Sequence, residues 1–135
     1  IEAKSLANAL TSNASATQAL IARFDPLLRQ SANPRFVYLT TSVATSPRAW
    51  WGAYAASKAA AEVLVDCYAQ EVRNITPIRV AIVDPGATRT TMRAKAYPGE
   101  DPKRNKEPSV VGERILALLG EQFASPHRER VAQPA

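Results

Sequence analysis

The chain opens with a helical pattern of hydrophobic positions. From Ala3 to Gln30, apolar residues recur at intervals of three and four, which places them on one face of an α-helix. The repeating positions are Leu6, Ala9, Leu10, Ala16, Leu20, Phe24, Leu27 and Leu28. Because Pro26 has no backbone N–H to donate, we expect a kink or a one-turn break near Asp25.

Two later runs of apolar residues predict buried strands. Arg35 to Thr41 is rich in aromatic and β-branched residues, and Ile78 to Val83 is nearly all apolar, as in a strand covered on both faces. Between them, Ala53 to Asn74 is rich in alanine and contains neither glycine nor proline, which favours a long helix. This alternation is typical of an α/β fold with a parallel sheet.

The rest of the chain is less regular. Asp84 to Pro108 predicts a long loop with a short helix around Thr91 to Ala96, and loops of this length are usually functional. Ser109 to Leu119 predicts a final helix, with Ser109 as its N-cap and Gly120 at its end. We therefore expect residues 1–121 to form the folded unit and residues 122–135, which lack periodicity and hold the single histidine, to be a frayed tail.

Composition narrows the choice of partners and compartment. The 135 residues are 46% hydrophobic, which fits one globular unit, and 17 basic against 12 acidic residues give a net charge of +5. The basic residues are scattered, and their densest group, Lys103 to Lys106, lies among prolines, so we expect a solvated loop and no nucleic-acid site. No apolar run is long enough to span a bilayer, and no metal site is expected. The lone Cys67, expected to be buried in its helix, favours a reducing, cytoplasmic location.

The candidate chemistry centres on Tyr54 and Lys58. Residues four apart on a helix share a face, so the Lys58 ammonium is expected to lie near the Tyr54 phenol and to lower its pKa. A phenol with a lowered pKa can exchange a proton with an alcohol oxygen near neutral pH. Ser42 follows the first predicted strand and Asp84-Pro85-Gly86 follows the second, so both lie at the edge where open α/β sheets bind ligands.

These motifs, in this order and at these spacings, resemble the C-terminal half of a short-chain dehydrogenase/reductase of the classical type, over about Thr11 to Leu119. The matching stretches are Phe36-Val37-Tyr38-Leu39-Thr40-Thr41-Ser42, Tyr54-Ala55-Ala56-Ser57-Lys58-Ala59 and Asp84-Pro85-Gly86-Ala87-Thr88-Arg89-Thr90-Thr91-Met92. The resemblance implies a Rossmann-like, doubly wound parallel sheet. Its N-terminal half is expected to lie outside this sequence, because no glycine precedes Gly52 and no glycine-rich pyrophosphate motif is present.

The resemblance also implies a role for each site residue. Tyr54 would be the acid/base, Ser42 would donate to the substrate oxygen, and Lys58 would hold the nicotinamide ribose. Asn13 would support a proton-relay water; it fits better than Asn8 because Ala16 and Pro26 follow at the family's spacing.

The Ser42 assignment has a competitor. Ser42 precedes Tyr54 by 12 residues, one short of the commonest family spacing. Thr41 restores that count, but a neighbouring residue in a strand points the opposite way, and we therefore favour Ser42.

The loop after the second strand would face the nicotinamide of NAD or NADP. Its binding residues would be Pro85, Gly86, Thr88 and Thr90, together with Tyr54 and Lys58. Trp50, Trp51, Met92, Arg93 and Tyr97 are candidates to line a substrate pocket.

The resemblance also implies a quaternary structure. Small residues along the 53–74 helix would allow a homodimer or homotetramer.

The predicted function is an NAD(P)-dependent oxidoreductase acting on an alcohol or carbonyl. The alternatives are a non-catalytic nucleotide-sensing or scaffold protein that keeps the fold, and an extended-type epimerase or dehydratase, which would need a larger C-terminal domain.

Overall fold

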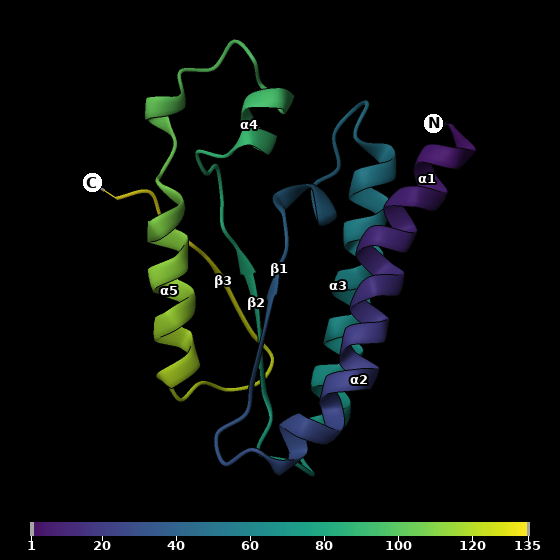
Figure 1. Ribbon diagram of the computed structural model, residues 1–135, viewed down its shortest axis with the longest axis vertical. Helices are drawn as coiled ribbons and strands as arrows, with labels where there is room; N and C mark the ends of the chain where they lie inside the picture. Colours follow the sequence, from purple (N-terminus) through teal and green to yellow (C-terminus); the bar gives the residue numbers. More distant parts are fainter. Residues whose placement is uncertain (1, 135) are drawn as a thin grey trace.

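The computed structural model describes residues 2–134 and shows an α/β arrangement with a parallel sheet of three strands (Figure 1). Strands β1 (Arg35–Leu39), β2 (Arg79–Asp84) and β3 (His127–Arg130) lie in that order, and both neighbouring pairs are parallel. Helix α3 (Gly52–Val72) connects β1 to β2, and α5 (Pro108–Gly120) lies between β2 and β3 in the sequence. The predicted fold class is confirmed as part of a Rossmann-like sheet.

Helices cover the sheet on both sides. Figure 1 shows α3 beside the N-terminal helices on one side and α5 on the other. Alternate residues of β2 serve the two layers: Val80 and Ile82 pack with α3, whereas Ala81 and Val83 pack with α5. Because both faces of β2 are covered, its sequence is continuously apolar rather than alternating.

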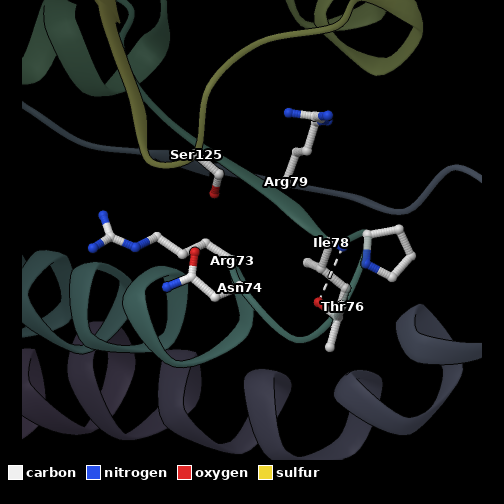
Figure 2. Close-up of a pocket in the computed structure, with 7 residues that line it drawn as sticks. Arg73, Asn74, Thr76, Ile78, Arg79 and Ser125 are labelled. Atoms are coloured by element: carbon white, nitrogen blue, oxygen red, sulfur yellow. Dashed lines mark hydrogen bonds between the residues drawn. The ribbon is translucent and has the colours of Figure 1, made fainter.

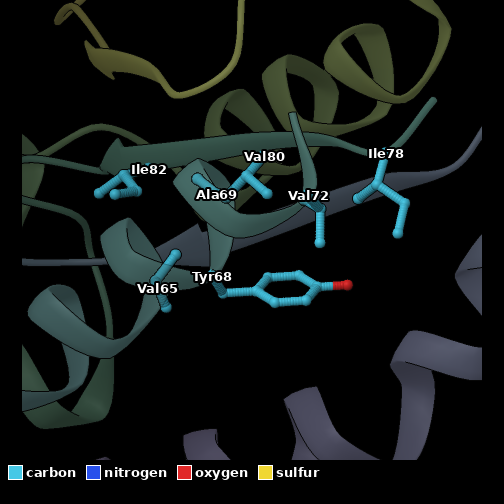
Figure 3. Packing of buried hydrophobic residues seen from close by; sticks show 7 residues of the cluster. All are labelled: Val65, Tyr68, Ala69, Val72, Ile78, Val80 and Ile82. Carbon is cyan, nitrogen blue, oxygen red and sulfur yellow. The ribbon is translucent and has the colours of Figure 1, made fainter. Parts of the chain in front are cut away.

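The cluster on the α3 side is drawn in Figure 3. It consists of Val65, Tyr68, Ala69, Val72, Ile78, Val80 and Ile82.

The N-terminal helix is irregular at a different place from the one predicted. Helix α1 (Ala3–Leu10) continues through a π-helical turn at Thr11–Ser15 into α2 (Ala16–Gln30), and α2 runs through Pro26 without ending. Of the expected kink or one-turn break near Asp25, the break is therefore wrong. At the π turn, where the regular backbone bonding pattern shifts, the Thr17 hydroxyl donates to the Asn13 carbonyl at 2.6 Å.

The C-terminal residues form a strand, so the expectation of a frayed tail is wrong for β3. The sequence does not predict this strand because its contacts with the neighbouring helices are made by charged side chains. Arg128 pairs with Glu62 and Asp66 of α3, and Glu129 pairs with Arg114 of α5. The next residue, Val131, is buried in the α5-side cluster. The boundary drawn at residue 121 therefore does not separate folded from unfolded chain.

Smaller differences concern element ends and exposure. Strand β1 ends at Leu39, and Ser42–Ala44 forms a short 3₁₀ turn. The predicted short helix is confirmed as α4 (Thr91–Ala96), and a second 3₁₀ turn spans Pro102–Arg104. Glu107, not Ser109, is the N-cap of α5, and Cys67 is exposed rather than buried. Within residues 2–134, no helix has the length and apolar character needed to cross a bilayer.

Candidate active site

A cavity of about 370 Å³ opens at the carboxyl ends of β1 and β2. It brings together most of the residues that the sequence singled out: Ser42, Tyr54, Pro85, Gly86, Thr88 and Thr90. Trp51, Met92, Arg93 and Tyr97 also line it, as predicted for a pocket wall. Trp50 does not, because its side chain is fully exposed. Neither Asn13 nor Lys58 lines the cavity. Each could therefore act on a ligand in it only through another residue or after its side chain has moved.

Tyr54 lies in the first turn of α3, with its ring edge-to-face against Trp51 at 5.9 Å between centroids. Burial raises the pKa of the Tyr54 phenol, a hydrogen bond with the Thr41 side chain lowers it, and the negative charge of Asp84 raises it further. The net direction is upward. The phenol therefore remains protonated at neutral pH and can act as a proton donor.

Lys58 is engaged elsewhere, so the prediction that it lowers the pKa of Tyr54 is wrong for this structure. Its ammonium donates to the Leu39 carbonyl at 2.6 Å and lies 4.6 Å from the centre of the Tyr38 ring. Burial lowers the pKa of Lys58, and the Glu62 carboxylate opposes this shift. Helix spacing alone predicts a contact between Lys58 and Tyr54, but in the structure Lys58 donates to a backbone carbonyl at the end of β1.

Asn13 reaches helix α3 through one intermediate side chain. Its amide donates to the Ser57 hydroxyl at 2.9 Å, and that hydroxyl donates to the Tyr54 carbonyl at 2.8 Å. Ser57 is fully buried. The π turn therefore holds Asn13 against the first turn of α3, where Tyr54 lies.

The loop after β2 is held in a tight conformation. Gly86 has a φ of 68°, in the left-handed region that favours glycine, and its N–H donates to the Asp84 carboxylate at 2.8 Å. The Thr88 hydroxyl donates to the Gly86 carbonyl at 3.1 Å. The Thr90 oxygen accepts from the Arg93 N–H and caps α4.

Two residues at this site were underestimated from the sequence. Thr41, whose side chain contacts Tyr54, was signalled by its spacing but was set aside because of the expected strand alternation. In fact β1 ends before Thr41, so that alternation does not apply. Lys106, assigned to a solvated loop, is buried and donates to the carbonyls of Pro85 and Ala87. No local pattern marks it, because its partners lie about twenty residues away in the sequence.

A second hollow, of about 180 Å³, lies at the opposite end of β2 and contains none of the predicted site residues. Figure 2 shows Arg73, Asn74, Thr76, Ile78, Arg79 and Ser125 around it. The Thr76 hydroxyl oxygen accepts from the Ile78 N–H, which closes the turn into β2. The residues that line this hollow include no tyrosine, histidine or carboxylate that could exchange a proton, and we assign it no chemistry.

Known proteins resemble both the sequence and the structure. The family model described as short chain dehydrogenase matches residues 2–101. The uncharacterized oxidoreductase YciK of Escherichia coli (strain K12) is 43% identical over 105 residues, covering 78% of this chain and 39% of YciK.

Two solved structures resemble the chain in fold as well. A short chain dehydrogenase from Salmonella enterica serovar Typhi superposes with a TM-score of 0.85 at 37% identity, covering 93% of this chain and 51% of that protein. One from Escherichia coli CFT073, solved with NADPH, has a TM-score of 0.84 at 34% identity, covering 94% and 54%. The chain thus spans about half the length of these two structures and a smaller share of YciK. It belongs to the short chain dehydrogenase family.

Proposed function

We propose that this chain carries the catalytic half of an NAD(P)-dependent oxidoreductase that interconverts an alcohol and a carbonyl. The observation that carries the proposal is a half-buried Tyr54 phenol, protonated at neutral pH, in a cavity shared with the Thr41 and Ser42 side chains and the Gly86 loop. The NADPH bound by the Escherichia coli CFT073 relative supports a nicotinamide coenzyme. When bound, that coenzyme supplies or accepts the hydride.

The residues of the chain would manage the proton. In the reducing direction, the Tyr54 hydroxyl donates its proton to the carbonyl oxygen as negative charge develops there. The raised pKa of Tyr54 keeps the phenol protonated at neutral pH, as a proton donor must be. Asn13, tethered through Ser57 to the first turn of α3, would support the water that returns a proton to the site.

One hydroxyl would hold the substrate oxygen beside Tyr54. Ser42 and Thr41 both line the cavity, and a donor here stabilises the developing oxyanion. We propose Ser42 for this role, as the sequence indicated, with Thr41 as the competitor, because its side chain lies close enough to lower the pKa of Tyr54. Single-hydroxyl variants distinguish the two.

The coenzyme would be held by Lys58 and the loop after β2. An ammonium has three N–H donors, and Lys58 uses one on the Leu39 carbonyl, which leaves two for ribose hydroxyls. Pro85, Gly86, Thr88 and Thr90 would contact the nicotinamide end, since all four line the cavity.

Assembly and location complete the proposal. Val63 and Leu64 of α3 are exposed, which supports an interface of two or four copies through this helix. The single cysteine of the sequence, Cys67, cannot form a disulfide within the chain, which supports a reducing, cytoplasmic compartment.

The experiment is to supply the full polypeptide with NADPH or NADH and a panel of aldehydes, ketones and alcohols, and to follow the nicotinamide absorbance. Turnover with a carbonyl or an alcohol is expected. Coenzyme binding without turnover on any compound would favour the non-catalytic sensing alternative. Turnover restricted to nucleotide-linked sugars would favour the extended-type alternative.

A further inference from the structure

Lys106 is an unusual residue to find buried beside this site. Only 4% of its surface is exposed, and within residues 2–134 it forms no ion pair with a carboxylate. Burial lowers the pKa of its ammonium, the nearby charge of Arg130 adds to this, and Asp84 opposes it. A buried charge without a paired carboxylate is costly, so the Lys106 ammonium depends on its hydrogen bonds.

Those hydrogen bonds go to the loop after β2. The ammonium donates to the Pro85 carbonyl at 2.8 Å and to the Ala87 carbonyl at 3.0 Å. The carbonyl between them, of Gly86, accepts from the Thr88 hydroxyl. Three consecutive carbonyls of the loop are thus satisfied from inside the protein.

The N–H groups of the same loop are only partly hydrogen-bonded within the protein. The Gly86 N–H is bound to Asp84, but the N–H groups of Ala87 and Thr88 have no acceptor among residues 2–134. Both residues line the cavity. The loop therefore offers hydrogen-bond donors to a ligand and keeps its acceptors occupied.

The segment that carries Lys106 is fastened to this loop at other points. The Arg89 N–H donates to the Lys106 carbonyl at 2.8 Å, and Thr88 and Lys106 form an isolated β-bridge. The Arg89 guanidinium also bonds the carbonyl of Pro102 and the carboxylate of Glu107. A Cβ at position 86 would lie 2.8 Å from the Lys106 ammonium nitrogen, so the ammonium packs directly against Gly86.

We propose that Lys106 is a positioning residue for the nicotinamide end of the coenzyme. By binding the carbonyls of Pro85 and Ala87, it fixes the loop so that the free N–H groups of Ala87 and Thr88 can meet an acceptor such as the carboxamide oxygen. The inference rests on the proposed function. It adds that the 102–107 segment, distant in sequence, sets the geometry of coenzyme binding.

The test compares two ligands that differ only at the nicotinamide end. In the full polypeptide, calorimetry measures the affinity for NADPH or NADH, whichever the wild type binds more tightly, and for the corresponding ADP-ribose fragment. The variant is Lys106→Met, which removes the ammonium and keeps the length. The matched control is Lys103→Met, because Lys103 is an exposed lysine of the same segment.

Lys106→Met is expected to weaken coenzyme binding about tenfold or more, since two carbonyls lose their donor, and to change fragment binding less than about twofold. Lys103→Met should alter neither. Equal weakening for both ligands, or no weakening for the coenzyme, would overturn the proposal. If Lys106→Met does not fold, Lys106→Gln replaces it. Its shorter neutral amide cannot hold both the Pro85 and Ala87 carbonyls as the ammonium does, so weaker coenzyme binding with nearly unchanged fragment binding is again expected, and equal changes for both ligands would overturn the proposal. A wild type that binds neither ligand would refute the proposed function itself.

Discussion

Replacing Gly86 by alanine should destabilise the protein through two separate effects. The φ of 68° costs a non-glycine residue about 1–2 kcal/mol. The added methyl would also lie 2.8 Å from the Lys106 ammonium nitrogen. Moving that ammonium weakens its bonds to the loop carbonyls and adds about 1 kcal/mol. The smaller entropy of an unfolded alanine chain returns about 0.4–1 kcal/mol. The net expectation is a loss of about 2 kcal/mol in the free energy of unfolding.

The matched control is Gly112→Ala. Gly112 lies inside α5, has no atoms within 4 Å of an added Cβ, and is exposed. Alanine there should stabilise the protein by about 0.5–1 kcal/mol because it favours the helix. Urea unfolding at a constant m-value measures both changes. The reasoning is refuted if Gly86→Ala changes stability by less than about 0.5 kcal/mol, or in the same direction as Gly112→Ala.

Three further predictions concern single hydroxyls and pH. The Tyr38 hydroxyl is buried without a hydrogen-bond partner, so Tyr38→Phe should raise the free energy of unfolding by about 1 kcal/mol in a chemical melt. Burial also raises the pKa of Tyr38 to about 12. The folded state therefore favours the protonated form of Tyr38, and the protein loses stability as the pH rises from about 10 towards about 12. Tyr38→Phe should lose less stability over this range, and identical pH profiles for the two proteins would contradict the reasoning. If Ser42 holds the substrate oxygen, Ser42→Ala should lower kcat about 100-fold or more and Thr41→Val much less, and the reverse order would assign the role to Thr41.

The elements that the sequence predicted well are those with a one-dimensional hydrophobic signal. The continuous apolar run of β2 and the alanine-rich α3 need only local reading, and both were found within two residues of their ends. Their topology followed from the general behaviour of parallel sheets. The same order placed Ser42, Tyr54 and the Pro85-Gly86 loop around one cavity.

What the sequence did not predict depends on contacts between distant residues. Strand β3 carries charged residues whose partners lie on α3 and α5, so it lacks the alternation that marks a half-buried strand. Lys58 bonds a carbonyl of β1, and Lys106 bonds carbonyls of the loop after β2. A lysine on a solvated face and a lysine bound to a distant backbone carbonyl look the same in a sequence.

The central claim is that the Tyr54 hydroxyl transfers the proton while hydride moves to or from the coenzyme. The most direct measurement is the turnover number of Tyr54→Phe in the full polypeptide, on the substrate that the wild type uses best, together with its coenzyme affinity. Tyr97→Phe, which alters another phenol lining the same cavity, is the control. The account predicts that kcat for Tyr54→Phe falls by about 100-fold or more with coenzyme affinity nearly unchanged. A Tyr54→Phe protein that keeps most of its kcat would contradict it.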